Sequence, residues 1–231
     1  MSVEPTRTSQ ETVSAPMSLL DRVAGMFYEP AAVFRSLRER PDFILPVILI
    51  LCAGIVTFIA TMRGNLTATL TPEQAEAIAK IPRLQLALSG AIGSVVMVAF
   101  GWVIRSLVFM LLGKATGGMG GYGPVLSSQG YVMLPQFLGT LIGVILMLGL
   151  GRPVTLSLAD FLSLAKLRAP LGAFLSQINP FVLGYLILAP IAIMETSGVN
   201  RRKALAIVMP CWALVVLVQA ILAIVSHAMQ G

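Results

Sequence analysis

The stretch Gly130-Tyr131-Val132-Met133-Leu134-Pro135 opens an apolar run that continues to Leu150. A run of this kind can cross a bilayer, because about 20 apolar residues in a helix span the hydrocarbon core. This one contains a proline, and glutamines at positions 129 and 136 flank the motif. Inside a membrane, the carbonyl that a proline leaves unbonded and the glutamine amides need partners from neighbouring helices. The stretch is therefore expected at the centre of a helical bundle.

The composition of the whole chain indicates a membrane protein. Of the 231 residues, 57% are hydrophobic and 11% are charged, whereas soluble globular chains carry roughly 25% charged residues. The predicted fold class is all-α, a polytopic bundle of five transmembrane helices with short interfacial amphipathic helices. The five-span domain is expected to occupy residues 42–231, with spans at residues 43–62, 84–112, 124–150, 178–194 and 204–227.

The residues before the first span divide into two parts. Residues 1–16 are polar, and we expect them to be a disordered cytoplasmic tail because they cannot bury enough apolar surface to fold. Residues 17–41 carry apolar residues at helical spacing, with Arg22 off the apolar stripe. Pro30 interrupts them and suits the first turn of a second helix, whose apolar side includes Phe34. Both helices are expected to lie on the membrane surface, apolar side down, or to pack against the bundle.

Two connecting segments have unusual compositions. Residues 113–123 are rich in glycine and contain Lys114. A phosphate-binding loop needs its lysine after the glycines, between a strand and a helix. This segment has neither feature, so we reject nucleotide binding and predict a flexible connector. Residues 151–177 are amphipathic but too polar for a span, which predicts a further interfacial segment.

The distribution of basic residues predicts the orientation of the chain. With the N-terminus inside, about nine Lys and Arg residues lie in inner segments and six in outer ones, which agrees with the enrichment of positive charge in cytoplasmic loops. We therefore expect a cytoplasmic N-terminus and an outside C-terminus. The same residues can touch anionic lipid headgroups. No cluster of basic and aromatic residues indicates nucleic-acid binding.

Residue types that support catalysis are scarce. His227 lies beside Ser226 at the end of the last span, without a third group to orient it as a base. Cys52 and Cys211 fall within apolar runs, and the chain contains no CxxC pair. No paired carboxylates lie within the spans, which also weakens a proton-coupled transport mechanism. We therefore predict no catalytic, metal-binding or cofactor-binding residues.

Several residues within the spans are expected to take part in helix packing. Arg105 is the one charge clearly inside a span, and snorkelling to the headgroups is the favoured interpretation, with an ion pair to Glu195 as the second. Gly139 and Gly143 form a GxxxG pair that allows two helices to approach closely. A small and polar face of the second span is expected to contact another helix, and it comprises Ser94, Val98, Gly101 and Arg105.

Three stretches in order resemble the Yip1 family of small polytopic membrane proteins, in its bacterial branch. Residues 27–34 (FYEPAAVF) with Arg40-Pro41 are similar to the opening pattern of the family. Residues 130–135 (GYVMLP) are similar to its GYxxLP motif, and residues 197–204 (SGVNRRKA) to its turn between the last two spans. Together the resemblance covers roughly residues 18–227.

The resemblance implies a non-enzymatic membrane scaffold or adaptor for another membrane protein or a GTPase-like partner. Eukaryotic members bind Rab GTPases and shape early secretory membranes, and some bacterial relatives work beside ABC-type exporters. No catalytic residues or cofactors are known for the family, so none carry over. The expected location is the inner (plasma) membrane of a bacterium. The expected partners are the lipid bilayer and a membrane protein or a second copy of the chain.

A second hypothesis rests on the polar residues of the third span, Ser127, Ser128, Gln129 and Gln136. These would suit a transport component, either an accessory subunit of an exporter or a channel-like oligomer. An intramembrane enzyme would need a convergent polar constellation that the sequence does not contain. The residues expected at contacts with a partner or between helices are Pro30, Phe34, Arg105, Gly130, Tyr131, Leu134, Pro135, Gly139, Gly143 and Glu195.

Overall fold

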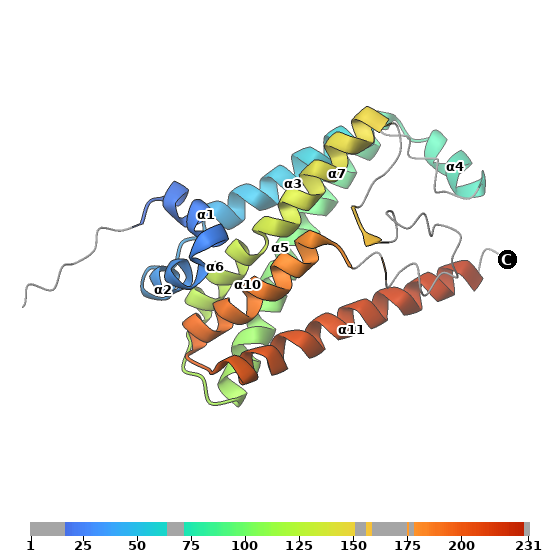
Figure 1. The fold of residues 1–231 in the computed structure, drawn as a ribbon. Helices are drawn as coiled ribbons and strands as arrows, with labels where there is room; N and C mark the ends of the chain where they lie inside the picture. Colours follow the sequence, from blue (N-terminus) through green and yellow to red (C-terminus); the bar gives the residue numbers. More distant parts are fainter. Residues whose placement is uncertain (1–16, 64–71, 151–155, 159–174, 176–177, 229–231) are drawn as a thin grey trace, which may run out of the picture.

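The computed structural model describes residues 17–63, 72–150, 156–158, 175 and 178–228, and these residues form helices without any strand (Figure 1). The helices are α1 (Leu19–Tyr28), α2 (Pro30–Glu39), α3 (Ile44–Arg63), α4 (Pro72–Ala79), α5 (Arg83–Ala115), α6 (Tyr122–Val132), α7 (Leu134–Leu150), α10 (Pro180–Ser197) and α11 (Arg201–Ala228). Five stretches are long and apolar enough to cross a membrane: Ile44–Arg63, Arg83–Ala115, Tyr122–Leu150, Pro180–Ser197 and Arg201–Leu222. The predicted all-α bundle with five spans is confirmed.

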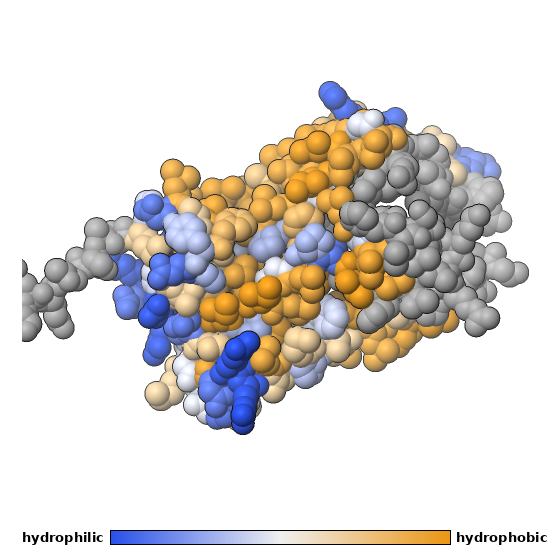
Figure 2. Space-filling view, viewed as in Figure 1, coloured by the Kyte–Doolittle hydropathy of each residue, from blue (hydrophilic) through white to orange (hydrophobic). Residues whose placement is uncertain are grey.

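The surface of the bundle is apolar along its sides and hydrophilic at one end. Large apolar side chains of α3, α5 and α11 are exposed, among them Leu51, Phe100 and Leu222. Figure 2 shows a broad hydrophobic band, with hydrophilic residues gathered around α1, α2 and the turn between α10 and α11. Continuous exposed apolar surface of this extent marks a surface that contacts lipid. We refer to the end that holds α1, α2 and the turn between α10 and α11 as the basic end.

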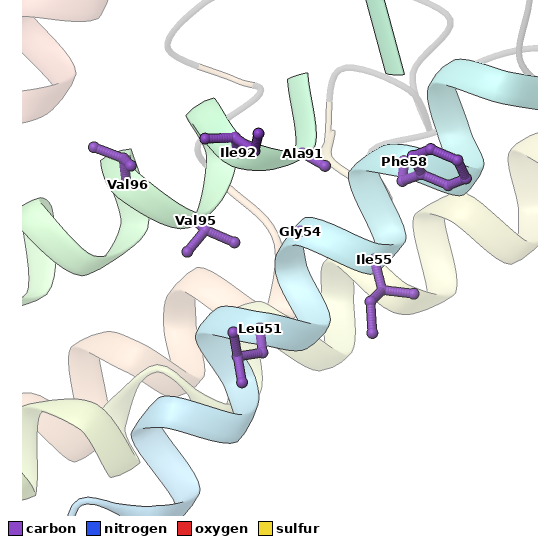
Figure 3. A pocket seen from close by; sticks show the side chains of 8 residues that line it. All are labelled: Leu51, Gly54, Ile55, Phe58, Ala91, Ile92, Val95 and Val96. Carbon is purple, nitrogen blue, oxygen red and sulfur yellow. The ribbon is translucent and has the colours of Figure 1, made fainter. Parts of the chain in front are cut away.

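Helices α3 and α5 pack along each other as an antiparallel pair. A Cβ atom added at Gly54 would lie 2.6 Å from Cγ2 of Val95, so the glycine permits the close approach of the two helices. Figure 3 shows Val95 projecting toward α3 beside this glycine, in a groove lined only by apolar residues and glycine. The hydroxyl of Thr57 donates a hydrogen bond to Oγ of Ser94 (3.1 Å), which satisfies two polar groups inside the pair.

The third span is two helices, whereas the sequence predicted one. Pro135 has no N–H, so the carbonyl of Tyr131 lacks its usual helical partner. The chain breaks at Met133, whose N–H donates to the carbonyl of Gly130 (3.2 Å). Helix α6 is the buried half, and seven of its eleven residues are buried. In α7 only Leu134 and Pro135 are buried. The predicted central position therefore applies to α6 and to the start of α7.

Helix α10 is the most enclosed span and contacts α2, α5, α6, α7 and α11. The side-chain oxygen of Asn179 caps its start by accepting the N–H groups of Phe181 (3.1 Å) and Val182 (2.8 Å). Gly198 ends it in the left-handed conformation (φ 71°), which glycine adopts at little cost. The chain then turns into α11, which diverges from α10 toward its C-terminal end (Figure 1).

Helix α2 crosses the basic end of the bundle against α6 and α10. Its apolar side chains Val33, Phe34 and Leu37 have no exposed surface, and Pro30 is its first residue. Packing against the bundle, one of the two predicted arrangements, is therefore correct for α2. A position of these helices at the membrane surface remains a prediction. Helix α1 leaves Leu20, Phe27 and Tyr28 exposed.

The glycine-rich loop is held in place, whereas the sequence predicted a flexible connector. The N–H of Met119 donates to the carbonyl of Ser197 (3.0 Å), and Nζ of Lys203 donates to the carbonyl of Thr116 (2.6 Å). A Cβ atom at Gly120 would lie 2.6 Å from the carbonyl oxygen of Thr196. The glycines therefore let the loop lie directly against the backbone at the end of α10.

Some predictions concern parts of the chain outside the described residues. These are the disordered tail at residues 1–16 and most of the interfacial segment predicted within residues 151–177. The side chain of His227 also falls outside them.

Candidate functional site at the basic end

Asp42 lies two residues before α3, at the border of the first span. Its backbone is tied to α6 through Ser127. The hydroxyl of Ser127 donates to the carbonyl of Asp42 (2.7 Å) and accepts the N–H of the same residue (3.0 Å). A single serine thus satisfies both backbone groups at the point where the chain enters the bundle.

The carboxylate of Asp42 joins three segments. One oxygen accepts hydrogen bonds from the hydroxyl of Tyr131 in α6 and from Nη1 of Arg22 in α1 (3.0 Å). The other oxygen accepts the N–H of Ile44 (2.9 Å). We call Arg22, Asp42, Ser127 and Tyr131 the Asp42 cluster. It connects α1, the start of α3 and the GYxxLP stretch.

The ionised form of Asp42 is favoured by this arrangement. Burial by itself would raise the pKa of the carboxyl group, because low polarity disfavours a charge. The hydrogen bond from Tyr131, the N–H of Ile44 and the guanidinium of Arg22 outweigh burial and lower the pKa of Asp42 below its usual value. The cluster is therefore an ion pair near neutral pH.

The burial of Arg22 corrects the expectation that this residue lies off the packed side of α1. The side chains of Arg22 and Asp42 are 10% and 13% exposed. Nε of Arg22 has no hydrogen-bond partner in the described structure. Removing one member of a buried ion pair typically costs about 3–5 kcal/mol, since the other charge stays buried. The pair therefore fastens α1 to the bundle.

The GYxxLP stretch is also a site of close packing. A Cβ atom at Gly130 would overlap Cγ of Pro46 in α3 and lie 3.2 Å from Nε1 of Trp102 in α5. Leu134 is 5% exposed. The ring of Pro135 approaches Gly184 of α10, where an added Cβ atom would lie 3.1 Å from it. The motif therefore brings α3, α5, α6 and α10 together.

The two glycines of the GxxxG pair have different surroundings. A Cβ atom at Gly139 would lie 2.5 Å from the ring of Phe181 in α10, so this glycine lets α7 approach α10. Gly143 is partly exposed.

Exposed cations surround the Asp42 cluster at the same end of the bundle. We call them the basic rim: Arg35, Arg38, Arg40, Lys114, Arg201, Arg202 and Lys203. They come from α2 and the residue after it, the end of α5 and the start of α11. Glu195 lies between them, with Nε of Arg35 3.8 Å from its carboxylate and Nη1 of Arg38 3.5 Å from its carbonyl.

Arg105 does not pair with Glu195 and contacts Tyr185 instead. Its guanidinium lies over the ring of Tyr185 in α10, 5.4 Å from the centroid, which is cation–π geometry. The side chain of a helical residue leans toward the N-terminus of its helix, which for α5 is the end away from the basic rim. The ion pair to Glu195, the second choice, is therefore not formed, whereas snorkelling to the headgroups stays a prediction.

Three of the four polar residues predicted for the third span are enclosed by the bundle. Ser127, Ser128 and Gln129 have no exposed surface. Both serine hydroxyls donate to backbone carbonyls, of Asp42 and of Val125. The amide of Gln129 has no hydrogen-bond partner in the described structure. These three residues therefore pack inside the bundle, whereas Gln136 lines a cleft beside α5 and α11.

Clusters of metal-binding side chains are absent from the described residues. No set of three or more His, Cys, Asp or Glu side chains gathers there. The polar contacts of the Asp42 cluster are all made within the chain. The cluster forms an ion pair that joins α1 to the start of α3 and to α6.

Comparison with known proteins gives two matches. A model of the Yip1 domain matches residues 24–223. The membrane protein YknW of Bacillus subtilis (strain 168) is 22% identical over 187 residues, which cover 77% of this chain and 79% of that protein. No solved structure matches the chain.

Proposed function

The chain belongs to the Yip1 domain family of membrane proteins, and on that premise we propose that it is a non-enzymatic scaffold whose basic end binds another membrane protein. The partner would bring an acidic surface close to the bilayer. The proposed site is the basic rim together with the outer face of α1 and α2.

One observation carries the proposal: the rim is exposed but rests on a rigid support. Helix α2 is anchored by Val33, Phe34 and Leu37, and α1 by the Asp42 cluster. The glycine-rich loop is fastened to the turn after α10. A surface that is ordered before binding loses less conformational entropy when a partner docks.

The charge of the rim supports both the orientation and the choice of partner. Seven exposed cations lie at the basic end, against three at the opposite end among the described residues, Arg63, Lys80 and Arg83. Cytoplasmic segments are the ones enriched in Lys and Arg. We therefore place the basic end and the N-terminus in the cytoplasm of a bacterium, with the C-terminus outside. A cytoplasmic rim would steer acidic partners toward the membrane surface.

The transport hypothesis is weaker in its channel form. It needs a wet path along the polar residues of the third span, and Ser127, Ser128 and Gln129 are fully buried. As an accessory subunit of an exporter, the chain would act through the same surface as the scaffold. That form is a particular case of the proposal and is tested by the same experiment.

The test is affinity purification from native membranes in mild detergent, followed by quantitative mass spectrometry. The wild-type chain is compared with a double variant of the rim, Arg201→Glu and Arg202→Glu. The matched control reverses two cations at the opposite end, Arg63→Glu and Lys80→Glu. We expect a membrane protein at near-stoichiometric yield with the wild type and the control, and its recovery to fall at least about tenfold with the rim variant, since like charges across an interface are costly.

Two results would contradict the proposal. One is a wild-type chain that purifies without any stoichiometric companion. The other is a companion that the rim variant retains as fully as the control does. A reporter fused after Gly231 checks the orientation separately, and a cytoplasmic signal would reverse it.

A further inference from the structure

A cleft opens between α5, the start of α7, α10 and α11, away from the basic rim. Its volume is about 680 Å³, within the range of roughly 300–1,000 Å³ that is typical of ligand sites. Most of its lining is apolar, and its polar members include Arg105, Gln136 and Trp212. All four bordering helices belong to candidate spans, so we expect the cleft to lie within the membrane.

Arg105 belongs to the candidate span Arg83–Ala115, and we expect its guanidinium to lie below the membrane border. It faces Tyr185, and the neighbouring Gly184 touches Pro135. Ser127 binds Asp42, which precedes the first span. Pro135 lies eight positions after Ser127. At about 1.5 Å per residue this separation corresponds to roughly 12 Å. A cation held at that depth is costly and marks a functional position by default.

Two N–H groups of residues that line the cleft have no acceptor. Nε of Arg105 and Nε1 of Trp212 are buried and make no hydrogen bond in the described structure. Buried donors are almost always paired, so an acceptor from outside the chain is the simplest explanation for both. The occupant should therefore present oxygen atoms at this point and an apolar body to the rest of the cleft.

The face of α5 that was expected to contact another helix borders this cleft. Ser94 does bond to α3 through Thr57. Val98, Gly101 and Arg105, on the same face, line the cleft instead, and a Cβ atom at Gly101 would meet nothing within 4 Å. The small-residue surface therefore stays open to the bilayer beside α11, which diverges from α10 (Figure 1).

A second copy of the chain could not neutralise Arg105. The chain has ten acidic residues, and the one that falls within the five candidate spans is Glu195. That carboxylate lies near the end of α10 beside Arg35. Charge complementarity therefore favours a lipid over self-association.

We propose that the cleft binds an anionic phospholipid of the surrounding bilayer. One acyl chain fills the apolar part along α11, and the acidic headgroup is drawn toward Arg105 and Trp212. An arginine at depth attracts phosphates and water and thins the leaflet locally, which lets the headgroup reach it. Neutral lipids fill the same apolar space but lack the net charge that pairs with the guanidinium.

The two tryptophans of the chain, Trp102 and Trp212, provide the test because both line the cleft. The full chain is reconstituted in phosphatidylcholine vesicles. Its tryptophan fluorescence is then titrated with phosphatidylglycerol or phosphatidylcholine that carries brominated acyl chains, which quench tryptophan on contact. We expect half-maximal quenching at an about fivefold lower mole fraction of the anionic lipid, the preference expected for one added basic contact.

Variants separate the site from general surface charge. Arg105→Gln should abolish the preference, Arg105→Lys should keep most of it, and Arg63→Gln, an exposed cation outside both the cleft and the rim, should leave it unchanged. Size-exclusion profiles confirm that each variant is folded. Equal quenching by the two lipids would overturn the proposal, as would an unchanged preference in Arg105→Gln. Quenching by neither lipid would also overturn it and would indicate a cleft closed by protein.

Discussion

Arg22 and Arg105 are both cations held among apolar helices, and their surroundings differ. Arg22 lies at the basic end and has a carboxylate partner, with 3.0 Å between its Nη1 and Oδ2 of Asp42. Arg105 lies deeper and has the ring of Tyr185 and a cleft. An arginine whose charge is neutralised within the chain serves the fold. An arginine without a neutralising partner is instead a candidate for binding something outside the chain.

The largest expected loss of stability follows from breaking the ion pair between Arg22 and Asp42. Asp42→Ala leaves Arg22 buried without a counter-charge and should lower the free energy of unfolding by about 3–5 kcal/mol. Denaturant titration in detergent measures the change. Glu39→Ala, at the exposed end of α2, is the control and should stay within about 0.5 kcal/mol. Similar losses for both variants would mean that the ion pair does not hold α1.

A smaller effect is expected at Tyr131, which shares the carboxylate. Tyr131→Phe keeps the ring and removes the hydroxyl that donates to Asp42. A hydrogen bond to a charged group contributes about 1.5–3 kcal/mol, and the same titration should show a loss of that size. If Tyr131→Phe unfolds at the same denaturant concentration as the wild type, the tyrosine of the motif serves only as an apolar ring.

The smallest effect is expected between Arg105 and Glu195. A double-mutant cycle of Arg105→Ala and Glu195→Ala should give a coupling energy below about 0.5 kcal/mol, because the two residues contact different partners. A coupling above about 1 kcal/mol would indicate an ion pair between them and would weaken the proposal that the cleft binds an anionic lipid.

Much of this fold could be predicted from local patterns. The five spans follow from apolar runs that are long enough to cross a bilayer, and the start of α2 follows from Pro30. The position of the third-span break was not predicted. The signal was Pro135, which removes the bond to Tyr131 and so interrupts the helix before it reaches the proline.

The candidate site was harder to predict because its contacts are not local. The pair of Arg22 and Asp42 joins residues 20 positions apart and forms only when α1 folds back onto the bundle. The available signal was that Arg22 and Asp42 are charged residues that each stand next to an apolar run. The environment of Arg105 depends on the crossing of α5 and α10, which sequence spacing does not reveal. The ordering of the glycine-rich loop depends likewise on the end of α10.

The measurement that tests the comparison most directly is the double-mutant cycle of Arg22→Ala and Asp42→Ala, with the free energy of unfolding in detergent as readout. A pair that shares a buried hydrogen bond should couple by about 1–3 kcal/mol, so the double variant should be more stable than the sum of the two losses predicts. Losses that simply add would contradict the account, because Arg22 would then be no better paired within the chain than Arg105.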